Sequence, residues 1–572
     1  MTKGLLAWIT GTHPPKFGAS SLPETHYACQ VLCRGYIAQR KDLATDLLGA
    51  ADASTASDAQ VFAAAYRRWG AALQEHVLGE YCVAVFDERR QCLFAASDAL
   101  GLRPLFYTTS GERFALASHL DALAEWTGDR EVDEEYVGDF LAWGQHFGCR
   151  TIFRGIRRLA GGHSLRWTAG GLAEFRTWSL EKVQPVRYRT ETEYDEHFRE
   201  LLSQGIRSAS GEKTWAELSG GLDSSSVICT AVEAGVADLQ AVSFVYPQSR
   251  TADEREWMEA VISKYSLPWH VLDGDAAQPF SAVPDRFVPE PSRAIIVWRL
   301  FREYEKLIEH HGVNVVLSGL GGDHVLFGDA PPPVHIADHF FHFDVRGALR
   351  ELGRWQRRDP RQRSFAYWLI KCGARPLMRY ILGHSIHYDR QSLGVCPWLD
   401  RGFVDRLHLS VARVPSPTPK MPSIDGQYFY ELVSRISLSA GQFWNQLVRT
   451  FAICYPLLYR PLVEFMYALP SDQQIRPGLD RVLQRRALQR FLPAKTFTRA
   501  NKKGPDESFF EGLRKNREMY SLLTERPHIV ERGYVDGAGW RNAVSTARFG
   551  RVPSIPCFLS ACSLEIWLRQ ID

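Results

Sequence analysis

The 572-residue sequence lacks the features that would place a protein in a membrane or outside the cell. Its opening segment, MTKGLLAWITGTHPPKFG, has one lysine before a short apolar run and no small-residue cleavage site, so it is a poor signal peptide. No apolar run reaches the length of a membrane span. The sequence therefore predicts a cytoplasmic protein without a membrane span.

Strong net charge and metal-type cysteine spacing are also missing. Lys and Arg number 68 against 65 Asp and Glu, and this net charge of +3 is too small to indicate nucleic acid or an anionic membrane as a partner. Eleven cysteines are scattered along the chain, and the pair Cys29 and Cys33 has no second pair or nearby histidine at zinc spacing. We expect reduced, mostly buried thiols.

The apolar pattern changes character near residue 185. Before it, residues 80–98 and 161–178 each hold two apolar runs around a polar turn, which is a hairpin signal. After it, strand and helix patterns alternate up to about residue 330, which indicates a parallel, doubly wound sheet. The rest of the chain reads as mostly helical. The length also favours more than one core.

We therefore predict an α/β protein with two domains. An antiparallel, β-rich domain covers residues 1–185, and a doubly wound parallel-sheet domain with helical additions covers residues 186–572. Within the second domain, the aromatic and helical region 330–450 is the expected place to bind substrate.

The segment WAELSGGLDSSSVICTAV (215–232) places two glycines, an acid and four serines between apolar runs. Its order of strand, glycine loop and helix predicts an anion site, because glycines let backbone N–H groups approach a ligand and the helix adds its positive end. A simple strand-to-helix turn is the alternative, but the polar residues Ser219, Asp223, Ser224 and Ser225 accompany the glycines. The loop G-x-x-x-x-G-K-[ST] occurs nowhere in the chain.

An acid in a phosphate loop requires a cation, because a bare carboxylate would repel phosphate. Mg²⁺ takes one or two carboxylates together with phosphate oxygens, so a second acid should follow a neighbouring strand. Asp323 meets this expectation, since it follows the strand-like VNVVLSG and a second glycine-rich loop. Both loops should lie at the carboxyl ends of parallel strands, where ligands bind in such sheets.

These segments resemble the signatures of a known superfamily. LSGGLDSSS looks like the pyrophosphate-binding loop of asparagine synthetases, β-lactam synthetases and lasso peptide macrolactam synthetases, and SGLGGDHVLFG is similar to their second signature. Residues 455–504 resemble their C-terminal signature. The resemblance runs with gaps from about residue 20 to 570, and three motifs in order make it specific at the superfamily level.

The resemblance implies that ATP adenylates a carboxylate and that an amine then attacks to form an amide. It implies that ATP and pyrophosphate are bound by Leu218, Ser219, Gly220, Gly221, Asp223, Ser224, Ser225, Ser243, Gly319, Gly321 and Gly322, and Mg²⁺ by Asp223 and Asp323. By motif position, Lys502 would offset charge on the α-phosphate. Lys503 replaces it if the register is shifted by one, and a solvated surface lysine is the alternative.

The N-terminal half is similar to the Ntn-type glutaminase domain of asparagine synthetase, notably over residues 79–107. That glutaminase uses a cysteine directly after Met1, whereas this sequence has Thr2, which could in principle serve as an N-terminal nucleophile. The Asn-Gly signature that binds glutamine is replaced by CRGYIAQ. We therefore expect a scaffold in which Asp98 and Arg103 hold the fold, and an amine source other than glutamine.

The sequence departs from the superfamily pattern a second time, at the position of the catalytic base. Asparagine synthetases have Glu, and β-lactam synthetases Tyr, where this sequence has Leu320, which cannot move a proton. A peptide α-amino group, with a pKa of about 7.7–8.0, is already partly neutral at pH 7 and needs less help. We therefore expect the attacking amine to be a peptide N-terminus. His324 is a possible proton acceptor, with a packed histidine as the alternative.

The sequence as a whole most resembles a lasso peptide macrolactam synthetase. CPWLDRGFVDRL (396–407) resembles a segment of those cyclases, although its aromatic residues could equally be core. The resemblance implies a precursor peptide as substrate, with a leader-binding protein and a leader peptidase as partners. A β-lactam synthetase-like ligase acting on a small substrate and an inactive scaffold protein remain the alternatives.

Overall fold

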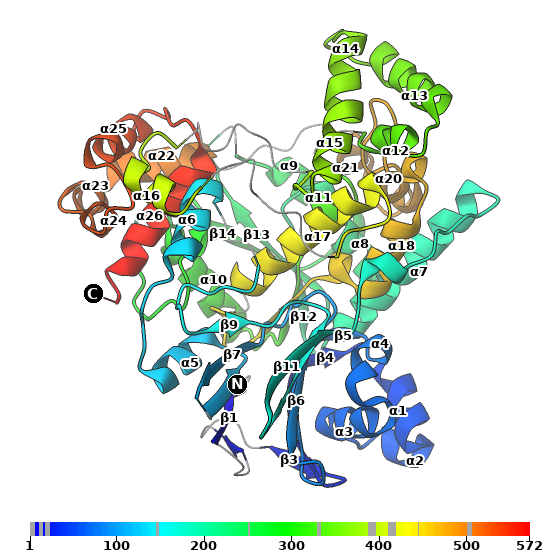
Figure 1. Cartoon of the computed structure of the whole chain (residues 1–572). Helices are drawn as coiled ribbons and strands as arrows, with labels where there is room; N and C mark the ends of the chain where they lie inside the picture. The colour runs from blue at the N-terminus through cyan, green and yellow to red at the C-terminus, as the bar shows by residue number, and fades with distance from the viewer. Residues whose placement is uncertain are drawn as a thin grey trace.

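The computed structural model describes residues 6–10, 15–17, 23–111, 113–144, 148–249, 252–328, 333–386, 396–409, 419–443, 446–499 and 506–571. Two antiparallel sheets lie in the N-terminal part of the chain, and one parallel sheet with many helices lies in the C-terminal part (Figure 1). This architecture confirms the predicted fold class. None of the helices in the described ranges combines the length and the apolar character that a membrane crossing needs.

The N-terminal strands form two sheets, ordered β2-β1-β8-β7-β9 and β11-β10-β6-β5-β4-β3. Their bounds are β1 (Leu6–Thr10), β2 (Lys16–Phe17), β3 (Glu24–His26), β4 (Cys29–Ile37), β5 (Gly79–Asp87), β6 (Cys92–Ser97), β7 (Phe106–Ser110), β8 (Arg113–Ala117), β9 (Arg157–Arg158), β10 (His163–Thr168) and β11 (Gly171–Arg176). Both predicted hairpins are present, as β5–β6 and as β10–β11.

Strand β5 is apolar along most of its length because both of its faces are buried. Tyr81 and Val83 belong to a core shared with helix α3 (Asp58–Trp69), whereas Cys82 and Ala84 belong to the core between the two sheets. This alternation is the period of two that a strand imposes on its side chains. The N-terminal domain is therefore a sandwich of two sheets with one outer face covered by helices.

The C-terminal sheet has the order β14-β13-β12-β15-β16 and is parallel throughout. Its strands are β12 (Thr214–Glu217), β13 (Gln240–Val245), β14 (Trp269–Asp273), β15 (Val315–Leu317) and β16 (Ala452–Cys454). The helices between them are α7 (Glu191–Ala209), which precedes β12, α8 (Leu222–Glu233), α9 (Arg255–Tyr265) and α10 (Trp298–His310). The alternation of strands and helices predicted up to about residue 330 is present.

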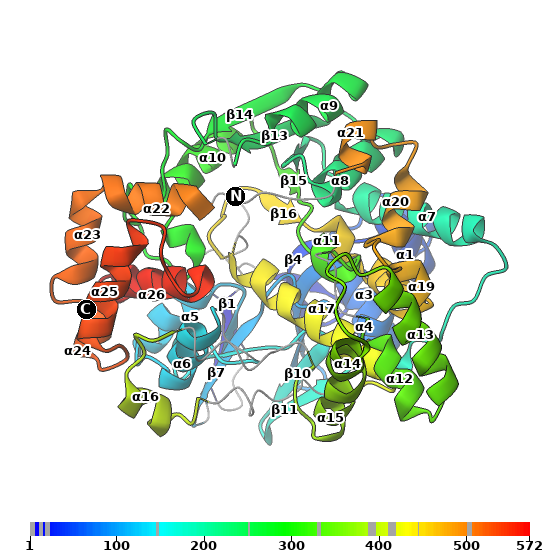
Figure 2. The ribbon, with the colours of Figure 1, turned by 90° about the horizontal axis from the view of Figure 1, so that it is seen from above.

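A helical lobe, residues 333–386, projects from the body of the molecule (Figures 1 and 2). It consists of α12 (His335–Phe341), α13 (Val345–Arg357), α14 (Phe365–Trp368), a π-helical turn (Leu369–Ala374) and α15 (Arg375–Ile381). Beyond it come α16 (Arg401–Arg406), α17 (Ile424–Phe443), α18 (Arg460–Ala468) and α20 (Val482–Leu488), and later α26 (Ile555–Leu568). Trp398 and Phe403 are fully buried, which favours the core interpretation of segment 396–407.

A buried cluster of charges, the domain joint, links the two domains. Arg103 donates to Glu80 Oε2 at 2.9 Å and to the carbonyl of Ile453 on β16 at 2.9 Å, and the backbone N–H of Tyr455 donates to Glu80 Oε1 at 2.7 Å. The Asp98 carboxylate accepts backbone N–H groups of the following turn, including that of Arg103. These contacts agree with the expectation that Asp98 and Arg103 hold the fold.

Candidate functional site

Two glycine loops meet at the carboxyl ends of neighbouring strands. One follows β12 and the other follows β15, and these strands pair in register, with Ala216 opposite Leu317. The loops touch closely at Gly319, where a Cβ atom would lie 2.6 Å from the backbone nitrogen of Ser224. Only glycine fits there, so the second loop is held directly against the start of α8.

The first loop presents backbone donors around the N-terminus of α8. Gly220 has φ +72°, a left-handed conformation that glycine adopts without strain. The hydroxyls of Ser219 and Ser224 lie 3.0 Å apart and tie the loop to the first turn of α8. The N-cap, Gly221, offers no side chain to the helix N-terminus, so the N–H groups there remain able to meet an anion.

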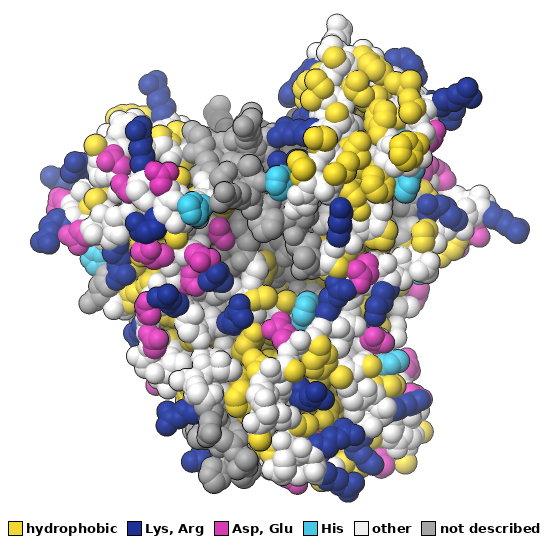
Figure 3. Space-filling view, viewed as in Figure 1, with side chains coloured by type: hydrophobic (Ala, Val, Ile, Leu, Met, Phe, Trp, Pro, Cys, Tyr) yellow, Lys and Arg dark blue, Asp and Glu magenta, His cyan; other side chains and the backbone are white. Residues whose placement is uncertain are grey.

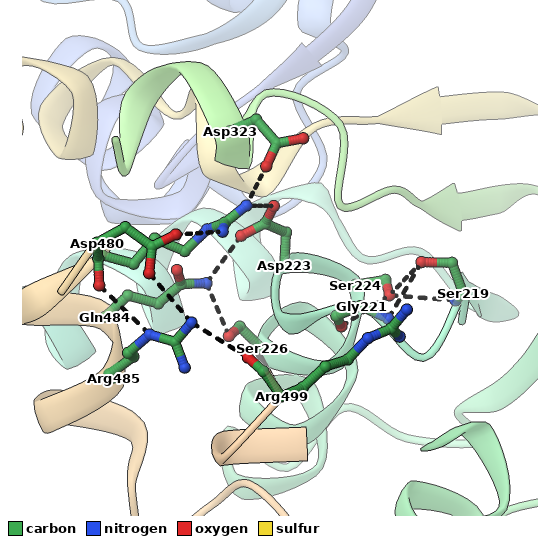
Figure 4. Close-up of polar contacts among 11 residues, drawn as sticks. Ser219, Gly221, Asp223, Ser224, Ser226, Asp323, Asp480, Gln484, Arg485 and Arg499 are labelled. Carbon is green, nitrogen blue, oxygen red and sulfur yellow. Dashed lines mark hydrogen bonds and ion pairs between the residues drawn. The ribbon is translucent and has the colours of Figure 1, made fainter. Parts of the chain in front are cut away.

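The two predicted metal-binding acids face each other across one guanidinium group (Figure 4). Arg481 Nη2 lies 3.0 Å from Asp223 Oδ2 and also pairs closely with Asp323 Oδ1. Gln484 donates to Asp223 Oδ1 at 3.0 Å. Burial raises the pKa of Asp223, and the nearby Arg481 charge works in the opposite direction.

The residues at this point fit a magnesium ion that arrives with phosphate. Asp223 and Asp323 both reach one shared position, which the cationic group of Arg481 fills. In the described ranges, no three His, Cys, Asp or Glu side chains converge as a metal-binding group. Two carboxylates with phosphate oxygens are nevertheless a normal donor set for Mg²⁺. Binding of one ion by both acids would require Arg481 to move.

The loops border a cavity of about 650 Å³, a size suited to a nucleotide-sized ligand. Of the predicted residues, those lining it are Leu218, Ser219, Gly221, Asp223, Ser224, Ser243, Gly319, Gly321, Gly322, Asp323 and His324. Gly220 lies behind the loop against Trp257, and Ser225 is fully buried. Lys502 and Lys503 lie outside the described residues.

Ser243 interacts mainly with the protein itself, whereas the Nδ1 atom of His324 is buried without a hydrogen-bond partner among the described residues. Ser243 donates its hydroxyl to the carbonyl of Leu218 at 2.6 Å and accepts the indole N–H of Trp269. Burial lowers the pKa of His324 to about 4, so its ring is neutral near pH 7. Leu320 lines the cavity and adds only apolar surface.

Sequence reasoning missed the positive side of the cavity. Arg481, Gln484 and Arg485 stand at the start of α20, spaced so that they share one helix face. Arg499 pairs with Glu254 and donates to the carbonyl of Gly220 at 2.9 Å, which braces the first loop from behind. The signal for this side of the cavity is the basic run DRVLQRR within the third motif, where Arg481, Gln484 and Arg485 are three and four residues apart.

Comparison with known proteins relates both domains to described families. A glutamine amidotransferase domain matches residues 18–178, and asparagine synthase matches residues 197–391 and 450–569. The glutamine-hydrolyzing asparagine synthetase 3 of Bacillus subtilis is 29% identical over 231 residues, which cover 37% of each chain. A putative glutamine-hydrolyzing asparagine synthetase of Mycobacterium bovis is 28% identical over 292 residues, covering 48% of this chain and 43% of that one.

The matched stretches thus span less than half the length of these relatives. Among solved structures, the glutamine phosphoribosylpyrophosphate amidotransferase from B. subtilis covers 57% of this chain and 88% of its own, at 12% identity and a TM-score of 0.23, which is too low to support a conclusion. The asparagine synthase match, in contrast, covers more than half of the chain and contains both glycine loops and α20. The chain belongs to the asparagine synthase family.

Proposed function

We propose that this protein is an ATP-dependent, AMP-forming amide ligase that closes a macrolactam ring in a precursor peptide. It adenylates an Asp or Glu side chain of the peptide, and the N-terminal amine of the same peptide then attacks to give an isopeptide bond. In this proposal, a leader-binding protein and a leader peptidase prepare the substrate. A β-lactam synthetase-like ligase with a small substrate is the nearest alternative within the family.

The observation that supports ligase chemistry best is the pairing of the two glycine loops with their two acids. Asp223 and Asp323 come from loops after neighbouring parallel strands and meet at one cation-binding point. A phosphate-binding loop alone would serve many nucleotide-binding proteins. Two carboxylates beside it suit the cleavage of a phosphoanhydride, since the leaving pyrophosphate carries several negative charges.

The first step forms a bond between a carboxylate oxygen of the peptide and the α-phosphorus of ATP, and it breaks the bond from that phosphorus to the bridging oxygen. The loop amides near Ser219 and Gly221 bind the departing pyrophosphate. Mg²⁺, when bound by Asp223 and Asp323, would neutralise part of its charge. Arg485 and Arg499 line the same cavity and add positive charge. Lys502 is assigned to the α-phosphate by its motif position.

The second step forms the C–N bond and releases AMP, and the amine loses one proton. The family's Glu or Tyr is replaced by Leu320, which lines the cavity without an ionisable group. A peptide N-terminus suits this site because its amine is partly neutral at pH 7. In this proposal His324, which lies beside Asp323 in the same cavity, accepts the proton; burial lowers its pKa to about 4, so it is a weak base. The replacement of the glutamine signature by CRGYIAQ supports an amine other than ammonia.

Substitution of Asp223 by Asn tests the adenylation step. We expect ATP-dependent pyrophosphate release to fall by about a hundredfold or more, because loss of groups that only support a metal's ligands already costs about 10–100-fold in affinity or activity. Asp238→Asn is the matched control, since Asp238 is exposed and has a left-handed backbone that Asn tolerates. Full activity of Asp223→Asn would contradict the role of Asp223 in binding Mg²⁺. No release by the wild type with any carboxylate would favour the inactive scaffold.

Ring closure is tested with the precursor peptide and its N-terminally acetylated form. We expect the free peptide to lose one water in an ATP-dependent reaction, measured by mass spectrometry. The acetylated peptide should still support pyrophosphate exchange, because its carboxylate is unchanged, but it should not lose water. Water loss from the acetylated peptide would contradict the assigned amine. Amide formation with free small amines only would favour the small-substrate ligase.

A further inference from the structure

Exposed apolar side chains are concentrated on the helical lobe. Twelve large hydrophobic side chains are exposed in the described residues, and seven of them lie within this one lobe. These seven form the apolar patch: Phe343, Val345, Leu349, Ile370, Met378, Ile381 and Leu382. Figure 3 shows hydrophobic side chains spread over the lobe at the upper right, whereas the rest of that face is mixed. Single exposed apolar residues are normal, but a gathering of this kind marks an interaction surface.

The apolar patch is additional to the core of the lobe. Leu352, Trp368 and Cys372 pack together inside it, with Ile336 from α12. On α13, Ala348 and Leu352 point inward and are buried, whereas Val345 and Leu349 are about half exposed. Phe343, just before α13, is 91% exposed. The lobe therefore carries more apolar surface than its own folding uses.

Positive charge accompanies this surface. Residues 333–386 contain ten Lys or Arg and four Asp or Glu, whereas the remaining 518 residues contain 58 and 61. Each of the four acids is engaged within the protein: Asp338 with backbone N–H groups, Asp344 with His339, Glu351 with Arg354 and Asp359 with Arg363. Among the exposed arginines of the lobe, Arg346, Arg357 and Arg361 have no ion-pair partner among the described residues, whereas Arg350 and Arg358 line cavities shared with residues 471–499.

Apolar and basic residues are adjacent in the sequence of the lobe. Val345 is followed by Arg346, Leu349 by Arg350 and Ile370 by Lys371, whereas Arg379, after Met378, donates to the carbonyl of Ser385 within the protein. Because successive helical residues are about 100° apart, each of the first three basic positions borders the apolar stripe and does not lie within it. Helices that lie in the headgroup region of a bilayer have this arrangement of apolar and basic faces.

We propose that the helical lobe docks on an anionic lipid surface, with the apolar patch between the headgroups and its arginines on the lipid phosphates. Long Arg side chains can reach the phosphates while their stems stay on the apolar surface. The alternative, a helical protein partner, would lay its apolar face into a hydrophobic groove of the lobe. Two cavities lined by lobe residues also include residues of 471–499 and lie at the base of the lobe, between it and the body.

Vesicle flotation of the full-length protein tests this proposal. We expect the protein to float with vesicles made of equal parts phosphatidylcholine and phosphatidylglycerol, and to remain unbound with phosphatidylcholine alone. High salt should weaken the binding because the attraction is partly electrostatic. Arg346→Gln with Arg357→Gln should weaken it about tenfold or more. No flotation with the anionic vesicles would overturn the proposal and leave the apolar patch to a protein partner.

Apolar substitutions separate insertion from simple charge attraction. Phe343→Asn with Ile381→Gln should abolish flotation, and Phe343 has φ +60°, which Asn tolerates, so folding should be preserved. Phe549→Asn is the matched control, because Phe549 is 74% exposed but lies outside the lobe. Its flotation should equal that of the wild type. Thermal melting verifies that all variants fold, and equal flotation of the patch variant and the control would overturn the role of the patch.

Discussion

Two arginine–carboxylate clusters in this molecule use the same chemistry in different surroundings. At the domain joint, Arg103 and Glu80 have side chains 3% and 4% exposed, and backbone groups of the facing domain satisfy them. At the cavity, Arg481 is 11% exposed, and its partners Asp223 and Asp323 are 13% and 35% exposed. The first cluster is sealed on all sides, whereas the second borders a space where a ligand can enter.

The difference indicates which cluster can exchange its partners. A sealed ion pair cannot be replaced by solvent or ligand, so its contribution is to hold the domains in one arrangement. Gly35 on β4 shows how closely the neighbouring strand approaches β5 at Glu80, since a Cβ atom there would lie 2.0 Å from the Glu80 carbonyl oxygen. An ion pair at a cavity wall can open when a cation of higher charge arrives. We therefore expect Mg²⁺ to restore none of the stability that is lost when the Arg103–Glu80 pair is broken. We expect it to compensate for the loss of Arg481 at the cavity.

The largest effect should come from Arg103→Met. This change leaves Glu80 buried without its cation, and breaking a buried pair costs about 3–5 kcal/mol of unfolding free energy. Chemical denaturation followed by tryptophan fluorescence measures the loss, and added Mg²⁺ should restore none of it. A second variant, Arg103→Met with Glu80→Gln, should recover part of the stability, since no charge then remains unpaired. A loss of unfolding free energy below about 1 kcal/mol would contradict the sealed joint, because ion pairs that are exposed to solvent contribute about that little.

A smaller effect is expected from Arg481→Gln. Without magnesium, Asp223 and Asp323 then face each other without a cation, which should cost about 1–3 kcal/mol. Magnesium chloride should raise the melting temperature of this variant more than that of the wild type, because the ion binds only the folded arrangement of both acids. Arg486→Gln is the matched control: Arg486 pairs with Asp195 at 2.7 Å, away from the cavity. Equal magnesium responses in both variants would contradict the shared metal point.

Local patterns in the sequence predicted the sheets well and the positive charges poorly. The hairpins and the alternating strands and helices follow from spacings of two and about 3.6 residues, which local sequence carries. The meeting of Asp223 with Asp323 followed from the rule that parallel strands end at one edge. Arg481 could not be placed in the same way, since α20 reaches the site through packing across 258 positions of sequence. Whole-chain charge likewise concealed the basic lobe, because its excess is balanced by the rest of the chain.

The smallest effect should be a change in how the unfolding free energy depends on pH, caused by Glu80 at the domain joint. Burial raises the pKa of Glu80 from 4.5 to about 7, and Arg103 opposes this only in part. Between these values the folded protein holds a proton that the unfolded chain has released, so Glu80 makes stability fall as the pH rises from about 4.5 to 7 and leaves it constant above.

Glu80→Gln removes that proton while keeping a similar shape. The unfolding free energy of Glu80→Gln should therefore rise relative to the wild type across this window, apart from a constant offset, and the difference should level off above pH 7. Glu212→Gln, at an exposed position, should run parallel to the wild type at every pH. Parallel curves for Glu80→Gln as well would mean that Glu80 stays ionised beside Arg103, and that the sealed joint holds its charges as the open cluster does.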